Sequence, residues 1–158
     1  PCGLYGPFAR RPDCVTAGIR YPYEQPPAEG TALEIAPGVL WARMPLPMAL
    51  DHVNVYALDD GDGWTVFDTG FDSARTRGAW AKLLAGPLQG KPVTKVIASH
   101  HHPDHIGLAG WFQAQGARLA TSRTAWLFAR RSAPPAARNA GLLARRGDGP
   151  GYPGQTRG

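Results

Sequence analysis

Six consecutive residues hold most of the side chains in this sequence that can bind a metal ion: His100, His101, His102, Pro103, Asp104 and His105. They include four of the five histidines of the chain. In an extended segment alternate side chains point to the same side, so we expect His100 and His102 to point together and His101 to point away. Two imidazoles with this spacing form half of a site for a divalent metal.

The end of the same run adds ligands of two kinds. Asp104 supplies a carboxylate and His105 a further imidazole, and Zn²⁺ accepts both types. In a site with two metal ions, the water between them is deprotonated near neutral pH and becomes a nucleophile. The run therefore predicts a metal site suited to hydrolysis.

The run lies between a predicted strand and a predicted helix. A junction of this kind can direct short side chains at one point from a rigid scaffold. Alternating apolar residues, turn residues and capping residues predict the remaining elements. The predicted strands span residues 33–35, 39–44, 53–58, 64–67, 93–98 and 117–121, and the predicted helices span 72–84, 106–115 and 122–130. This order predicts an α+β fold with one mixed β-sheet and flanking helices.

Composition divides the chain of 158 residues into three parts. Residues 1–30 are rich in Pro, Gly and Arg, and we expect an irregular N-terminal arm. Residues 31–131 contain every predicted strand and helix and are long enough for one domain with a core. Residues 132–158 consist largely of Arg, Pro, Gly and Ala. We expect this tail to be disordered, because it buries too little apolar surface to offset the entropy of ordering.

The charge and the cysteines indicate the setting of the protein. Eight arginines but only one acid, Asp148, follow His105, and the formal net charge is +5. These arginines are not interleaved with a recognisable nucleic-acid-binding fold, so we expect a solvated tail that does not bind nucleic acid. Cys2 and Cys14 do not form a disulfide framework. With neither a secretory signal nor an apolar run of roughly 20 residues, we expect a soluble cytoplasmic protein without membrane association.

The histidine run and the predicted strand end Phe67-Asp68-Thr69-Gly70, about 30 residues before it, together resemble the metallo-β-lactamase superfamily. The resemblance covers roughly residues 31–131. It implies an αββα sandwich and a hydrolytic site with one or two zinc ions. By position, His100 and His102 would bind the first zinc, and Asp104 and His105 the second. It also implies that Asp68 supports these ligands without itself binding metal, although a strand-end turn alone would explain an aspartate there.

Part of the family pattern is missing from this sequence. The family takes a histidine, a bridging aspartate and a second histidine from its C-terminal half, whereas this chain has no histidine after His105. The second half of the sandwich is missing as well, which would leave an apolar face of the first sheet exposed. The change in composition after Arg131 suggests the hypothesis that the tail is an out-of-frame continuation of a longer metallo-hydrolase. His52 is either a pocket residue or an ordinary loop histidine.

Two functions of different classes follow from these observations. The first is a zinc-dependent hydrolase in which a metal-bound hydroxide attacks a small-molecule ester, thioester, lactone or similar centre. Asp104 would be its catalytic residue, orienting the hydroxide. The second is a truncated, non-catalytic fragment or a partner-dependent module, with an incomplete metal site and a partner chain over the exposed sheet face. Because the C-terminal ligands are absent, the sequence leaves open whether this chain is an active enzyme.

Overall fold

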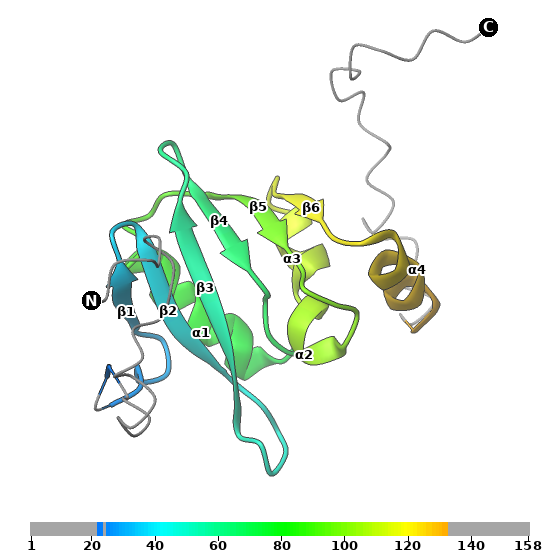
Figure 1. Ribbon diagram of the computed structural model, residues 1–158, viewed down its shortest axis with the longest axis horizontal. Coiled ribbons are helices and arrows are strands. Elements are labelled where there is room, and N and C mark those ends of the chain that lie inside the picture. The colour runs from blue at the N-terminus through cyan, green and yellow to red at the C-terminus, as the bar shows by residue number, and fades with distance from the viewer. Residues whose placement is uncertain (1–21, 24, 133–158) are drawn as a thin grey trace, which may run out of the picture.

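A computed structural model describes residues 22–23 and 25–132 of the protein. The predicted strands form one six-stranded sheet in chain order (Figure 1). The strands are β1 (Ala32–Ala36), β2 (Val39–Pro45), β3 (His52–Asp59), β4 (Trp64–Phe67), β5 (Val93–Ile97) and β6 (Arg118–Ala120). The pairs from β1 to β4 are antiparallel, while β4, β5 and β6 run parallel. The predicted mixed sheet is therefore confirmed. The predictions for the N-terminal arm, the two cysteines and the arginine-rich tail lie outside the described residues.

The helices are α1 (Ala74–Ala85), α2 (Pro103–Ile106), α3 (Ala109–Gln113) and α4 (Arg123–Ser132). Helix α1 begins after Ser73, whose hydroxyl accepts a hydrogen bond from Thr76 N at 3.1 Å, as expected for a capping residue. Within the described part of the chain, no helix is long and apolar enough to cross a membrane.

The prediction of a single helix over residues 106–115 is wrong. The chain enters a helix three residues earlier, at Pro103, and divides into α2 and α3. The physical reason lies outside the segment, because Leu108 N donates to the hydroxyl of Thr69 at 3.0 Å. A backbone donor that bonds to a side chain on another element is not available to extend the helix.

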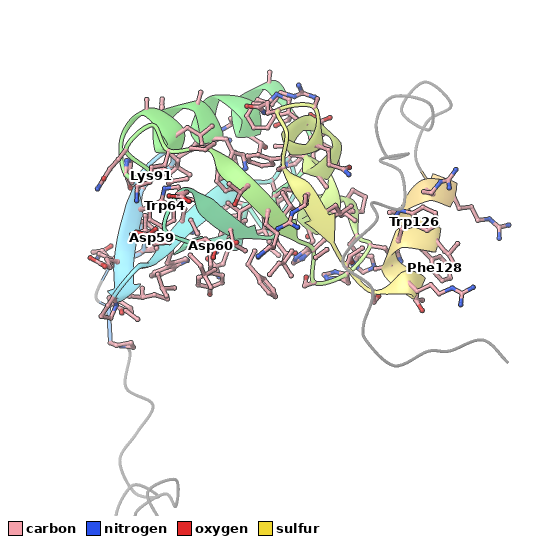
Figure 2. All side chains as sticks on the ribbon, turned by 90° about the horizontal axis from the view of Figure 1, so that it is seen from above. Asp59, Asp60, Trp64, Lys91, Trp126 and Phe128 are labelled. Carbon is pink, nitrogen blue, oxygen red and sulfur yellow. The ribbon has the colours of Figure 1, made fainter. Side chains whose placement is uncertain are left out.

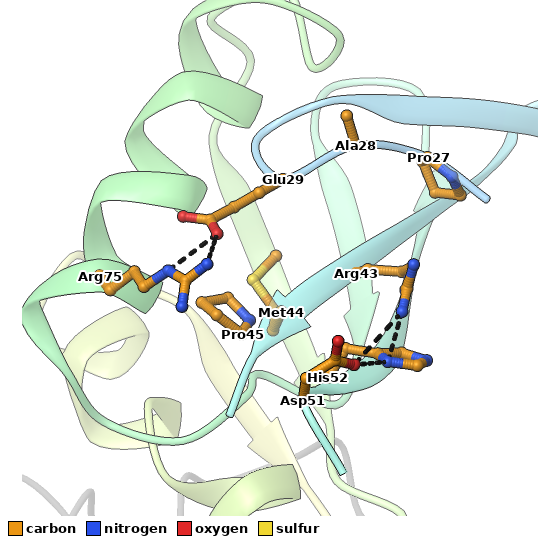
Figure 3. A pocket seen from close by; sticks show the side chains of 9 residues that line it. All are labelled: Pro27, Ala28, Glu29, Arg43, Met44, Pro45, Asp51, His52 and Arg75. Atoms are coloured by element: carbon orange, nitrogen blue, oxygen red, sulfur yellow. Dashed lines mark hydrogen bonds and ion pairs between the residues drawn. The ribbon is translucent and has the colours of Figure 1, made fainter. Parts of the chain in front are cut away.

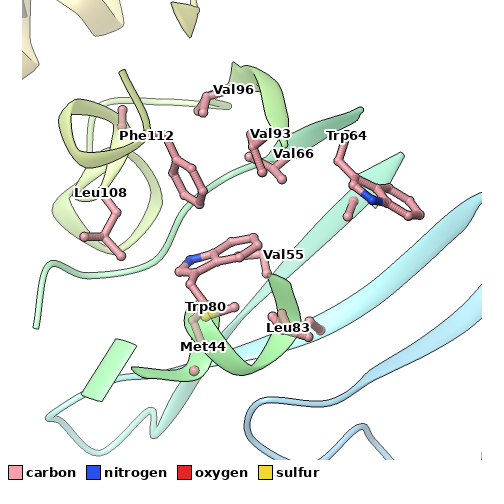
Figure 4. Close-up of a cluster of buried hydrophobic side chains, with 14 of the residues drawn as sticks. Met44, Val55, Trp64, Val66, Trp80, Leu83, Val93, Val96, Leu108 and Phe112 are labelled. Atoms are coloured by element: carbon pink, nitrogen blue, oxygen red, sulfur yellow. The ribbon is translucent and has the colours of Figure 1, made fainter. Parts of the chain in front are cut away.

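A hydrophobic core fills the space between the sheet and the helices. Val55, Val66 and Val96, on three neighbouring strands, are all fully buried against this layer. Trp80 of α1 and Phe112 of α3 meet edge to face, with ring centroids 5.0 Å apart (Figure 4). Edge-to-face aromatic pairs add to the stabilisation that burial provides. The core therefore holds both helices against the central strands β3, β4 and β5.

The opposite face of the sheet carries a second row of apolar side chains. Residues paired across neighbouring strands share a face, and the register therefore aligns Leu33, Trp41, Tyr56, Phe67, Ile97 and Ala120. Figure 2 shows α1 and α3 on one side of the sheet, side chains projecting from the other, and α4 beside the sheet next to β6. Phe67 is 37% exposed. No helix or strand of the described chain covers this row, which we call the open face.

Candidate metal centre

The histidine run and the segment Asp68-Thr69-Gly70 lie side by side because they follow two parallel strands. Phe67 at the end of β4 pairs with Ile97 at the end of β5, and Asp68 N donates to Ile97 O at 2.9 Å. The carboxyl ends of parallel strands meet at one edge of a sheet, where ligand sites commonly form. The two motifs that are distant in sequence are thus brought to the same edge.

Asp68 is the hydrogen-bonding centre of this edge. Its carboxylate accepts from the backbone N of Ser99 at 2.8 Å, the Ser99 hydroxyl at 2.8 Å and Nδ1 of His105 at 2.8 Å. The residue is only 6% exposed and has a φ of 61°, in the left-handed region that few non-glycine residues adopt. A residue in this conformation persists where its surroundings fix it. Asp68 therefore connects the end of β4 to both ends of the histidine run.

Three of the four histidine rings gather at this edge. The ring of His100 lies 4.6 Å from that of His102 and 4.0 Å from that of His105, measured between centroids. The ring of His101 is 6.4 Å from that of His100, but it lies 4.9 Å from the ring of His102 and 5.0 Å from that of Phe128 of α4. The structure thus places His100 and His102 together, and His101 lies beside His102 as well as beside Phe128.

The donor atoms do not surround a single point. No group of three or more His, Cys, Asp or Glu side chains within residues 22–23 and 25–132 is arranged to hold a metal ion. The two side chains predicted to bind the second metal face each other, with Nε2 of His105 3.3 Å from Oδ2 of Asp104. The types of donor nevertheless fit zinc, because three imidazoles and one carboxylate are ligands that zinc accepts.

The hydrogen bonds of Asp68 also determine which ring nitrogen each histidine presents. A carboxylate only accepts, so the Ser99 hydroxyl donates to it and in turn accepts from Nδ1 of His100, 2.9 Å away. Nδ1 of His105 likewise carries the hydrogen that it donates to Asp68. When the rings are neutral, their Nε2 lone pairs are then the ones available to a metal. Burial and, less strongly, the neighbouring rings of His105 and His102 lower the pKa of His100, which favours this neutral form.

Two residues of the motifs had no role assigned from the sequence but hold α2 in place. The backbone N and the hydroxyl of Thr69 both donate to His105 O, at 2.7 and 2.9 Å. A Cβ on Gly107 would lie 2.3 Å from Pro103 O and 2.9 Å from Gly70 O, so only glycine fits there without a shift of the backbone. In the sequence, only their position beside the residues that carry the resemblance indicated a role for Thr69 and Gly107.

His52 lies in a different place from the histidine run. It is the first residue of β3, so its interpretation as a loop histidine is wrong. It lines a cleft of about 160 Å³ together with Arg43, Asp51 and Arg75, and none of residues 100–105 contributes to that lining (Figure 3).

Known proteins resemble the part of the chain that contains this edge. Residues 48–117 match the family model of the metallo-β-lactamase superfamily. The probable metallo-hydrolase YqjP of Bacillus subtilis (strain 168) is 35% identical over 75 residues, which are 47% of this chain and 23% of that protein. A β-lactamase domain protein from Burkholderia ambifaria has 41% identity and a TM-score of 0.62, over 67% of this chain and 34% of its own. This chain belongs to the metallo-β-lactamase superfamily.

More distant members of the superfamily share the fold. The metallo-β-lactamase FIM-1 of Pseudomonas aeruginosa, solved in its mono-zinc form, has 23% identity and a TM-score of 0.55, over 64% of this chain and 45% of its own. The predicted α+β fold of metallo-β-lactamase type is thus confirmed. The chain spans less than half the length of each of these relatives. The predicted domain boundaries at residues 31 and 131 stay predictions.

Proposed function

We propose that this chain provides ligands for zinc in a hydrolase of the metallo-β-lactamase superfamily that acts on a small-molecule ester, thioester, lactone or similar substrate. The observation that carries the proposal is the gathering of three imidazole rings and Asp104 where β4 and β5 end, beside the buried carboxylate of Asp68. The membership of the superfamily of metallo-hydrolases supports the same reaction class.

The residues that would hold one or two zinc ions are His100, His102, Asp104 and His105. A bound ion would supply Lewis-acid chemistry, polarising the substrate and lowering the pKa of water. Asp68 keeps a hydrogen on Nδ1 of His105, and therefore directs Nε2 outwards as a ligand. Asp104 has carboxylate oxygens that can orient a water molecule by accepting its hydrogen, which is the catalytic role we assign to it.

A second candidate is a non-catalytic fragment or a partner-dependent module. The sequence has no histidine after His105 to complete the ligand set. The open face also lacks a covering layer among the described elements, and soluble monomers rarely leave large apolar patches exposed. In this candidate, a partner chain covers the open face and the metal site of this chain alone is incomplete. For both candidates we also propose a cytoplasmic location.

One experiment separates the two candidates. The purified chain is dialysed against zinc, its metal content is measured by mass spectrometry, and a panel of esters, thioesters and lactones is tested for turnover. For the hydrolase we expect one or two zinc ions per chain, a zinc affinity about 10-fold or more weaker in His102→Ala, and little change in the matched control His101→Ala.

The outcomes have distinct meanings. Less than one weakly held zinc and no turnover that depends on His102 would favour the second candidate. Unchanged zinc content in both variants would show that the ligand assignment is wrong.

A further inference from the structure

The cleft beside His52 contains an arginine whose hydrogen-bond donors are not all used. The cleft has a volume of about 160 Å³ and lies where β2 ends and β3 begins (Figure 3). Arg43 projects into a cluster with Asp51 and His52, while Arg75 and Glu29 form a separate ion pair at 2.7 Å. Nε of Arg43 is buried and has no hydrogen-bond partner among the described residues.

A second donor of Arg43 and the carboxylate of Asp51 both contact the same ring nitrogen, Nδ1 of His52. Nη2 of Arg43 contacts Nδ1 of His52, which lies only 2.5 Å from Oδ1 of Asp51. A ring nitrogen either donates or accepts, so it cannot satisfy both neighbours. The carboxylate of Asp51 can only accept, so the ring is the donor in that pair. Nη2 of Arg43 then lacks an acceptor as well.

Nε and Nη2 form one edge of the guanidinium, and this edge binds a carboxylate elsewhere in the protein. Arg77 uses it to hold Asp72, with Nε to Oδ1 at 2.8 Å and Nη2 to Oδ2 at 3.0 Å. This planar fork matches the two oxygens of a carboxylate or phosphate group. At Arg43 the nearest carboxylate is Asp51, at 3.6 Å from Nη2, and that side chain is 81% exposed. Asp51 therefore does not occupy the edge as Asp72 does.

We propose that the cleft binds a small oxyanion, a carboxylate or phosphate group, on the Nε and Nη2 edge of Arg43. Because Nε is buried, the side chain of Arg43 has to turn towards the cleft for Nε to reach the ligand. The site shares no residue with the predicted zinc ligands. It therefore stands independently of the proposed hydrolase activity.

The test follows the Nε–H signal of Arg43 by NMR in the full chain, with a chelator present to keep it free of metal. Sodium acetate and sodium phosphate are titrated at pH 7, each replacing sodium chloride at constant ionic strength. We expect a saturable shift with a Kd on the order of millimolar, the range of a weak single-group ligand. Acetate alone, phosphate alone or both together each support the site and identify the chemical class of its ligand.

Variants connect the binding to the proposed edge. Arg43→Lys keeps the charge but loses the fork, so binding followed on neighbouring backbone signals should weaken about 10-fold. The matched control Arg77→Lys should bind as the wild type does, and Asp51→Asn, which leaves the edge intact, should retain binding. The proposal is overturned if neither anion gives a saturable shift, or if Arg43→Lys binds the anion as well as the wild type.

Discussion

Two histidines of this protein pair with a carboxylate, and the two pairs differ in almost every other respect. His105 Nδ1 lies 2.8 Å from Asp68, whose side chain is 8% exposed, and His52 Nδ1 lies 2.5 Å from Asp51, whose side chain is 81% exposed. Asp68 also accepts two hydrogen bonds from Ser99. Asp51 instead shares the ring of His52 with Arg43.

The difference shows what a short distance between a histidine and a carboxylate does and does not indicate. A buried carboxylate with three donors is fully satisfied and fixes the orientation of the ring. An exposed pair contributes little to stability, since solvent competes with the interaction, and its members can exchange partners. The pair of His105 and Asp68 is suited to holding a metal-binding residue in place. The pair of His52 and Asp51 is suited to a site that binds a small molecule reversibly.

The largest effect on the free energy of unfolding is expected at Gly107, directly after the helix α2 that carries His105. Gly107→Ala would place a Cβ 2.3 Å from Pro103 O, and backbone on both sides must move. We expect a loss of about 3 kcal/mol in the free energy of unfolding, measured by urea denaturation, as for other overpacked sites. Gly78→Ala is the matched control, because no atom lies within 4 Å of its Cβ and it is inside α1. It should gain about 0.5–1 kcal/mol from helix propensity. Equal effects of the two substitutions would contradict the tight contact.

A smaller effect is expected from the carboxylates themselves. Asp68→Asn keeps the shape and tolerates the positive φ, but its amide group cannot accept all three hydrogen bonds. We expect a loss of about 2 kcal/mol in unfolding free energy and zinc affinity about 10-fold or more weaker.

Asp51→Asn is the matched substitution in the exposed pair and should change the urea midpoint only slightly and leave the zinc affinity unchanged. A comparable loss of stability in this variant would mean that the exposed pair is not as loosely held as its accessibility indicates.

The strands and the capping residue of α1 could be predicted because their signals are local. Apolar patterns and turn residues predicted all six strands to within one residue at each end, and Ser73 stands directly before α1. The boundary between α2 and α3 could not be predicted, since the Leu108 N–H bonds to Thr69, 39 residues away in the sequence. Local periodicity carries no information on such a contact.

The candidate site was likewise predictable from the sequence only in part. The histidine run is contiguous, so its residue types and spacing were readable, and the strand end at Asp68 could be connected to it only by resemblance. The unpaired Nε and Nη2 edge of the Arg43 guanidinium had no signal in the sequence. It depends on what Asp51 and His52 do around it in the folded protein, and no residue type or spacing encodes a donor that lacks a partner.

The smallest effect expected is on the titration of Asp51, and it tests the direction of the hydrogen bond in the exposed pair. The pKa of Asp51 lies below its ordinary value of 3.8, with the hydrogen bond from His52 as the first cause and the charge of Arg43 a lesser one. A lowered carboxyl pKa stabilises the fold above pH 3.8, and this contribution is lost as the pH falls through the lowered pKa.

Carbon-detected NMR titration of the Asp51 carboxyl between about pH 2 and 6 measures this shift directly. His52→Ala should move the midpoint towards 3.8 by more than Arg43→Gln does, because the ring is the donor that Asp51 loses. The reverse order would mean that Arg43 donates to His52 and that its Nη2 is already satisfied. The fork would then have one free donor in place of two, and His52, unlike His105, would not donate to its carboxylate.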